Sequence, residues 1–284
     1  MCAACAGAAS QSGAVADNAV SAPTISLFRL DGCVAFVSGA AGHLGRAMSR
    51  ALCEAGAHVI LNGRDDARLK DFEGELRGAG HSAERAAFDV SDFARVRAFF
   101  ASRPRLDILI NNAIAMTPAP FASLTSQAFD ETYRSSVTAA FESARAALPA
   151  LRSAVTAMGS ASIINISSMY GQVAPDARIY AKPEQASPLH YGPAKAALLQ
   201  LTRHLAAEFG PERIRVNTLV PGPFPRDAVA KSDPAFAGRL AAKTMLGRTG
   251  DAAEIRGPLL FLASPASSYV TGASLAVDGG WTAW

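Results

Sequence analysis

Short apolar segments alternate with helical patterns from Leu30 to the end of the chain. Segments in which Val, Ile and Leu fill consecutive positions are typical of strands that are covered on both faces. Such strands are expected at Val34–Ser38, His58–Asn62, Arg85–Asp89, Leu106–Asn111, Ser162–Ser167, Ile214–Leu219 and Ser274–Val277. Because parallel neighbouring strands need a crossover connection, the alternation predicts an α/β fold with a doubly wound parallel sheet of about seven strands and helices on both faces.

The first crossover shows the helical pattern clearly. Its apolar residues recur at helical spacing and form one face, made of Leu44, Met48, Ala51 and Leu52. Gly56 follows as a C-terminal stop signal. A helix packed on the sheet is therefore expected between the first two strands.

The chain is expected to fold as one domain. Residues 30–284 contain no Pro/Gly/Ser-rich linker, internal repeat or low-complexity segment. Residues 1–28 are rich in Ala, Ser and Gly, and they predict a disordered tail ahead of a domain at 29–284.

Charge and cysteine content exclude several classes of protein. The 27 Lys and Arg against 24 Asp and Glu leave a net charge of +3 without a basic run, so no nucleic-acid partner is expected. No apolar run approaches about 18 residues and no signal peptide is recognisable, so we expect no membrane span and a cytoplasmic location. The four cysteines are expected to be ordinary reduced thiols, because the C-x-x-C of Cys2 and Cys5 has no second Cys/His pair and Cys33 and Cys53 lie in apolar segments. No metal site is expected.

A glycine-rich loop, SGAAGHLG at 38–45, joins the first strand to the first helix. Glycines at such a turn let backbone N–H groups and the helix dipole face a phosphate, so the loop predicts a pyrophosphate site. The expected binding residues are Gly39, Gly42, His43, Leu44 and Gly45. Taken alone, the glycine spacing also fits an ordinary tight turn.

The end of the second strand bears on the type of dinucleotide. The sequence VILNGRD places Asn62 and Arg64 where an acidic residue would bind a ribose 2′-hydroxyl. Arg64 can instead pair with a 2′-phosphate through its planar guanidinium. We therefore expect NADP(H) as the preferred cofactor, with NAD(H) as the alternative and a solvated loop arginine as the plainer interpretation.

Four polar residues lie at or after the end of the fifth strand. The segment INISSMYG places Ser167 and Ser168 at the strand end, and HYGPAK places Tyr191 and Lys195 one helical turn apart on the same face. Because the carboxyl ends of parallel strands form the ligand-binding edge of such a sheet, this set is a candidate catalytic centre.

These motifs resemble, in order, those of the short-chain dehydrogenase/reductase family, from about Leu30 to Trp281. The matching segments are SGAAGHLG, FDVSD, ILINNA, INISSMYG, YGPAK, IRVNTLVPG and GASLAVDGGW. The resemblance implies a Rossmann-like single domain of the compact branch. It also implies an oxidoreductase that interconverts a secondary alcohol and a ketone by hydride transfer.

The resemblance assigns catalytic roles to four positions. Tyr191 would be the general acid and base, and because free tyrosine has a pKa of about 10, a cation at Lys195 is expected to stabilise its phenolate. Ser168 would hold the substrate carbonyl oxygen, with Ser167 as its structural neighbour. The fourth position, usually asparagine, aligns with Ser136.

The resemblance also implies further cofactor contacts. Those expected are Asp89 and Val90 near the adenine, Asn111, Asn112 and Ala113 after the fourth strand, Tyr191 and Lys195 at the ribose, and Pro221 and Gly222 at the nicotinamide end. The threonine that usually follows the PG motif is missing, and Arg226 stands near that place.

Two segments, 172–190 and 223–249, are expected to border a small carbonyl or alcohol substrate as loops. Arg178, Tyr180 and Lys182 in the first would favour an anionic or hydroxylated compound, unless they form a solvated face. A sugar acid, a polyol and a 3-oxoacyl compound are the substrate classes considered.

Two other functions fit part of the sequence. A sugar-nucleotide epimerase or dehydratase shares the glycine spacing and the Gly192 that follows Tyr191, but only 89 residues follow Lys195, too few for that branch's substrate lobe. A non-catalytic NADP(H)-binding regulator is compatible with Ser136. The Ala/Leu-rich helices around 124–152 and 192–209 would pair into homodimers or homotetramers in this family, or pack internally.

Overall fold

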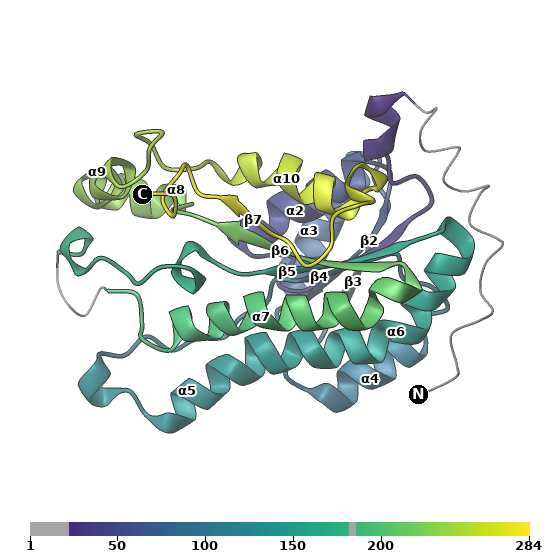
Figure 1. Ribbon diagram of the computed structural model, residues 1–284, viewed down its shortest axis with the longest axis horizontal. Helices are drawn as coiled ribbons and strands as arrows, with labels where there is room; N and C mark the ends of the chain where they lie inside the picture. The colour runs from purple at the N-terminus through teal and green to yellow at the C-terminus, as the bar shows by residue number, and fades with distance from the viewer. Residues whose placement is uncertain (1–22, 182–185) are drawn as a thin grey trace, which may run out of the picture.

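The computed structural model describes residues 23–181 and 186–284. Its centre is a seven-stranded sheet in the order β3-β2-β1-β4-β5-β6-β7, with every neighbouring pair parallel (Figure 1). The strands are β1 (Val34–Val37), β2 (His58–Gly63), β3 (Ala83–Ala87), β4 (Ile108–Asn111), β5 (Ala161–Ile166), β6 (Ile214–Pro221) and β7 (Ser274–Val277). The predicted doubly wound sheet is therefore confirmed.

Helices cover both faces of the sheet, as predicted. Those that the function depends on are α2 (His43–Glu54), α3 (Asp66–Gly78), α4 (Phe93–Ala101), α5 (Ser126–Tyr133), α6 (Ala139–Met158), α7 (Tyr191–Phe209), α8 (Asp227–Ser232), α9 (Pro234–Ala242) and α10 (Arg256–Ala263). One apolar cluster joins α2, α3 and α10 to one face, and a second joins α4, α6 and α7 to the other (Figure 1).

The strand boundaries differ from the predicted ones by at most two residues. The clearest shift is β3, which begins at Ala83 although Arg85 is the predicted start. This edge strand carries Glu84 and Arg85, which make ion pairs with neighbouring elements, so its sequence lacks the apolar run of a central strand.

Two further regions differ from expectation. Residues 1–22 of the predicted tail lie outside the described residues, whereas Thr24–Phe28 forms a short 3₁₀-helix inside its predicted range. The helix expected around 124–152 is divided, because a π-helical turn, Arg134–Thr138, separates α5 from α6. The alanines of α6 pack internally against the sheet.

The described cysteines are free thiols. Burial raises the pKa of Cys33 and of Cys53 to about 11, so both stay protonated near neutral pH. Cys2 and Cys5 lie outside the described residues. None of the helices at 23–181 and 186–284 has both the length and the apolar character needed to cross a bilayer.

A buried chain of side-chain hydrogen bonds crosses the sheet beneath its ligand-binding edge. Asn111 of β4 donates to Asn165 of β5 at 2.9 Å, and Asn165 donates to the Thr202 hydroxyl of α7 at 2.8 Å. Thr218 of β6 also donates to Thr202, at 2.6 Å, and Thr202 donates to the Leu198 carbonyl at 2.8 Å. One threonine therefore connects α7 to two central strands.

The Thr202→Val variant should lower the free energy of unfolding by about 2 kcal/mol, because it leaves the buried Asn165 and Thr218 groups without their partner. Urea denaturation would measure the loss. Thr156→Val is the matched control, since Thr156 makes the same bond to a carbonyl one helical turn back, at 3.2 Å, but on the exposed side of α6. Equal losses in the two variants would contradict the role of the buried network.

Candidate active site and cofactor cleft

The loop between β1 and α2 is folded as tightly as its glycines suggest. Gly39 has a φ of +64°, and a Cβ on Gly45 would lie 2.1 Å from the Gly39 carbonyl oxygen. Helix α2 starts at His43 after Gly42, and no side chain caps it. The amides of its first turn are therefore left to bind a ligand.

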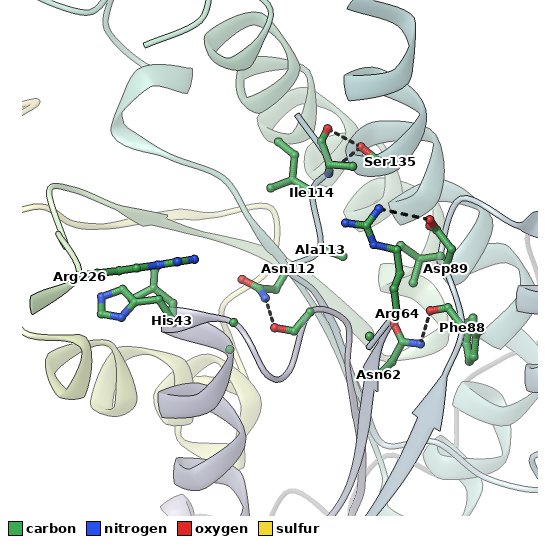
Figure 2. Close-up of a pocket in the computed structure, with 17 residues that line it drawn as sticks. His43, Asn62, Arg64, Phe88, Asp89, Asn112, Ala113, Ile114, Ser135 and Arg226 are labelled. Carbon is green, nitrogen blue, oxygen red and sulfur yellow. Dashed lines mark hydrogen bonds and ion pairs between the residues drawn. The ribbon is translucent and has the colours of Figure 1, made fainter. Parts of the chain in front are cut away.

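This loop borders a cavity of about 340 Å³ at the carboxyl ends of β1, β2 and β4 (Figure 2). The predicted cofactor residues that line it are Gly39, Gly42, His43, Leu44, Gly45, Asn62, Arg64, Asp89, Val90, Asn112 and Ala113. The structure thus brings most of the predicted cofactor residues together, although their binding role stays a prediction.

Other lining residues were not predicted to bind the cofactor. They are Gly63, Phe88, Ile114, Ala115, Ser135 and Arg226. Ser135 comes from the π-helical turn, and its hydroxyl bonds the backbone N–H and the carbonyl of Ala115, each at 3.0 Å. Arg226 comes from the segment that follows β6, so only the crossover connections bring it to the glycine loop.

Asn62 and Arg64, the two candidate cofactor residues at the end of β2, differ in exposure and in hydrogen bonding. The buried Asn62 amide donates to the carbonyls of Ala86, at 2.9 Å, and Phe88, at 3.1 Å, so it fixes the ends of β2 and β3 to each other. Arg64 has 69% of its side chain exposed, and its guanidinium lies 3.9 Å from the Asp89 carboxylate (Figure 2). Arg64 is therefore available to a ligand, whereas Asn62 is a structural residue beneath it.

The neighbouring residues Asn111 and Asn112, at the end of β4, have different hydrogen-bond partners. The Asn112 amide donates to the carbonyls of Ser38, at 2.9 Å, and Gly39, at 3.2 Å, and so holds the glycine loop. Asn111 was expected to line the cofactor, but it points into the buried network and does not line the cavity.

Ser168, Tyr191 and Lys195 meet where the segment after β5 packs against the first turn of α7. A Cβ on Gly171 would lie 2.8 Å from the Lys195 carbonyl carbon, and one on Gly192 would lie 2.8 Å from the Tyr170 carbonyl oxygen. Two glycines thus allow backbone-to-backbone contact there.

Ser167 reinforces this contact, as its predicted structural role requires. Its hydroxyl donates to the Lys195 carbonyl at 2.7 Å. The side chain of Ser168 begins the short 3₁₀-helix Met169–Gly171 by accepting the N–H of Tyr170 at 3.2 Å.

Lys195 is a buried cation. The residue is only 3% exposed. Its Nζ donates to the Ile166 carbonyl at 2.7 Å and lies 5.8 Å from the centre of the Tyr191 ring. In the described part of the chain no carboxylate pairs with it. Burial lowers the pKa of Lys195 to about 8.

Tyr191 is partly buried beside this cation. Burial raises the pKa of its phenol, and a hydrogen bond with Ser168 opposes that rise. The phenol is therefore protonated near neutral pH, the state that a proton donor needs.

Ser136 comes from a different element than these three residues. It belongs to the π-helical turn, and its buried hydroxyl donates to the Thr132 carbonyl at 2.6 Å. Pro221 and Gly222 lie at the carboxyl end of β6 beside β7, where the Gly222 N–H donates to the Val277 carbonyl at 3.0 Å, and neither lines the cofactor cavity.

The segment 223–249 was expected to be a loop, but it contains α8 and α9, and α9 packs on the other expected substrate segment at 172–181. Arg239 of α9 donates to the Ile179 carbonyl at 2.6 Å, and Lys243 pairs with Asp176 at 2.8 Å. Arg178 also pairs with Asp176, so it is not a free anion-binding group. Lys182 lies outside the described residues.

Tyr180, also from this loop, points inward. Its hydroxyl lies 2.9 Å from that of Tyr170, and its ring packs on Phe236 with the ring centres 5.7 Å apart. A second, larger cavity of about 710 Å³ lies beside Tyr170 and Gly192.

Comparison with known proteins gives consistent relatives. A family model described as enoyl-(acyl carrier protein) reductase matches residues 39–282. Galactitol 2-dehydrogenase (L-tagatose-forming) of Cereibacter sphaeroides is 37% identical over 262 residues, which are 91% of this chain and 98% of that one. The rhamnolipids biosynthesis 3-oxoacyl-(acyl-carrier-protein) reductase of Pseudomonas aeruginosa is 34% identical, over 89% of this chain and 98% of that one.

Solved structures agree with these relatives. The gluconate 5-dehydrogenase of Burkholderia cenocepacia, in complex with NADP and tartrate, has a TM-score of 0.81 and 32% identity, with 92% of this chain and 100% of that chain covered. These relatives are named dehydrogenases or reductases and match over nearly their whole length. The chain therefore belongs to the short-chain dehydrogenase/reductase family and is an oxidoreductase of its compact single-domain branch.

Proposed function

We propose that this enzyme interconverts a secondary alcohol and a ketone with NADP(H), using Tyr191 as general acid and base. The observation that carries the proposal is the buried Lys195 ammonium, one helical turn from Tyr191 and without a carboxylate partner among the described residues. A buried charge left this way is costly and is typical of a functional site.

The cleft fits a dinucleotide phosphate. The uncapped first turn of α2 offers backbone donors to a pyrophosphate, and the exposed Arg64 offers a guanidinium to a 2′-phosphate. The gluconate 5-dehydrogenase with a similar fold was crystallised with NADP, which supports the same choice here.

Each polar group at the centre then has a chemical role. The bound nicotinamide would supply or accept the hydride. Tyr191 gives its phenolic proton to the carbonyl oxygen during reduction and takes it back during oxidation. Ser168 donates a hydrogen bond to that oxygen, where negative charge develops.

Lys195 acts on Tyr191 and on the cofactor rather than on the substrate. Its ammonium stabilises the phenolate, and its remaining N–H groups are free to hold the ribose hydroxyls. Ser136 supports the π-helical turn through its bond to Thr132, so we assign it a positioning role in place of the usual asparagine.

The lining of the larger cavity indicates which class of substrate the enzyme binds. Residues that line it include Pro118, Phe121, Val173, Pro175, Leu189 and Ala196, and none of its described lining residues carries a charge. Such walls bury an alkyl chain well and offer hydroxyl groups few side-chain partners, namely Tyr170, Gln172 and Ser187. The cavity therefore favours a 3-oxoacyl compound over a sugar acid or polyol.

Cytoplasmic location and pairing of α6 and α7 into homodimers or homotetramers are expectations that follow from the family. They are part of this proposal.

The Tyr191→Phe variant should lower the rate of NADPH oxidation about 1,000-fold, because the proton donor is lost, while NADPH affinity changes less than about twofold. The rates would be followed by nicotinamide absorbance on a panel with a 3-oxoacyl thioester and a keto sugar acid. Tyr269→Phe is the matched control, since Tyr269 is fully exposed. Full activity in Tyr191→Phe would overturn the mechanism, and a faster wild-type rate on the sugar acid would overturn the substrate class.

Lys195→Met should leave only a small residual activity yet stabilise the cofactor-free protein near pH 7. The folded pKa of Lys195, about 8, lies below its ordinary value of 10.5, so the unfolded chain binds the proton more tightly and wild-type stability rises with pH across that interval. The gain at pH 7 is about 3 kcal/mol, and it should disappear above about pH 10. Thermal melts from pH 6 to 10 would show this, and a variant less stable than wild type at pH 7 would contradict it.

Arg64→Ala should weaken NADPH binding about tenfold to a hundredfold and leave NADH binding unchanged, because only NADPH carries the 2′-phosphate. Titration of both cofactors would measure this, with the exposed Arg203→Ala as control. Equal losses for the two cofactors would show that Arg64 does not read the 2′-phosphate.

A further inference from the structure

Arg226 is a positively charged residue that lines the cofactor cavity but has no role in the proposed mechanism. It precedes α8, on the segment that leaves β6, and its side chain reaches the cavity from the side opposite β2. In the described residues its side chain has neither a hydrogen-bond nor an ion-pair partner, whereas Arg239 donates to the Ile179 carbonyl and Arg248 pairs with Glu254. A guanidinium that is kept in a cleft without a partner is available to an anion.

The position of Arg226 within the cavity indicates which anionic group of the cofactor it would bind. Figure 2 shows Arg226 on the same side as His43, with Arg64 and Asp89 across the cavity and Asn112 between the two groups. Arg64 and Asp89 are charges of opposite sign 3.9 Å apart, so they partly offset one another. The excess positive charge therefore lies at the His43 side, where α2 begins.

The His43 imidazole is a second polar group without a partner there. Its Nε2 is buried and has no hydrogen-bond partner in the described structure. His43 is the first residue of α2, whose first turn contains no acidic side chain and no side-chain cap. Imidazole nitrogen, guanidinium and helix amides thus surround the same corner of the cavity.

We propose that Arg226 and His43 form a clamp on the pyrophosphate of the dinucleotide, separate from the contact of Arg64 with the 2′-phosphate. The inference rests on the proposed cofactor. It explains the missing threonine after the PG motif, because the segment after β6 then contacts the phosphates with a charged group in place of a hydroxyl.

Three nucleotides separate this clamp from its alternatives. NADP⁺ carries both phosphate sites, ADP carries the diphosphate alone, and adenosine 2′-monophosphate carries the 2′-phosphate alone. Arg226→Ala should weaken NADP⁺ and ADP about tenfold or more and change adenosine 2′-monophosphate less than about twofold, as measured by calorimetric titration. Arg64→Ala should give the converse pattern, with ADP unaffected.

Further variants test charge and position. Arg226→Lys should recover part of the ADP affinity, because it keeps the charge but loses the planar pair of donors. His43→Ala should weaken ADP by a smaller factor than Arg226→Ala. Lys231→Ala is the matched control, since Lys231 is an exposed cation on α8 that does not line the cavity.

The outcomes are distinguishable. Unchanged ADP affinity in Arg226→Ala, no ADP binding by the wild-type protein, or an equal loss of adenosine 2′-monophosphate would each overturn the clamp. Arg226 is exposed, so the variant should melt with the wild type and a binding loss would not reflect unfolding. A wild-type protein that binds neither NADP⁺ nor NAD⁺ would instead overturn the proposed function itself.

Discussion

The ammonium group of Lys195 lies buried under the end of β5 with one backbone carbonyl as its partner, and much of the structure can be understood from this constraint. A charge in that position destabilises the folded chain unless a ligand completes its hydrogen bonds. The energetic cost of this burial falls on the same residue that we propose assists Tyr191 in catalysis. At Lys195, the buried charge that we propose catalysis needs also lowers the stability of the folded protein.

Rigid packing around Lys195 maintains the arrangement. Gly171 and Gly192 let the segment after β5 touch the first turn of α7, and Thr202 fixes α7 to the central strands two turns later. The side chains that we propose as catalytic thus stand on tightly packed backbone. The expected substrate segments are also packed together, because Ile179 of the loop at 172–181 and Leu240 of α9 share a buried apolar cluster and Lys243 pairs with Asp176.

The sequence predicts what depends on local pattern. Buried parallel strands and the glycine loop follow from contiguous residues, so the sheet, the cleft and most of its lining were predicted. An edge strand such as β3 is less predictable, because charged pairs replace its apolar signal. Asn111 and Asn112 show that one residue of register decides which side chain faces the cavity. Arg178 was taken as a possible substrate ligand, but its pairing with Asp176 depends on the turn that the loop makes. Arg226 required the tertiary structure, since more than 180 residues separate it from His43.

The pH dependence of alcohol oxidation tests the central claim most directly, because Tyr191 must then act as a base. If the Lys195 ammonium stabilises the phenolate enough to outweigh the burial that raises the pKa of the free Tyr191 phenol, the wild-type rate should rise through an apparent pKa well below the ordinary tyrosine value of about 10. The residual rate of Lys195→Met should rise only above that value. The same apparent pKa in both proteins would contradict the account.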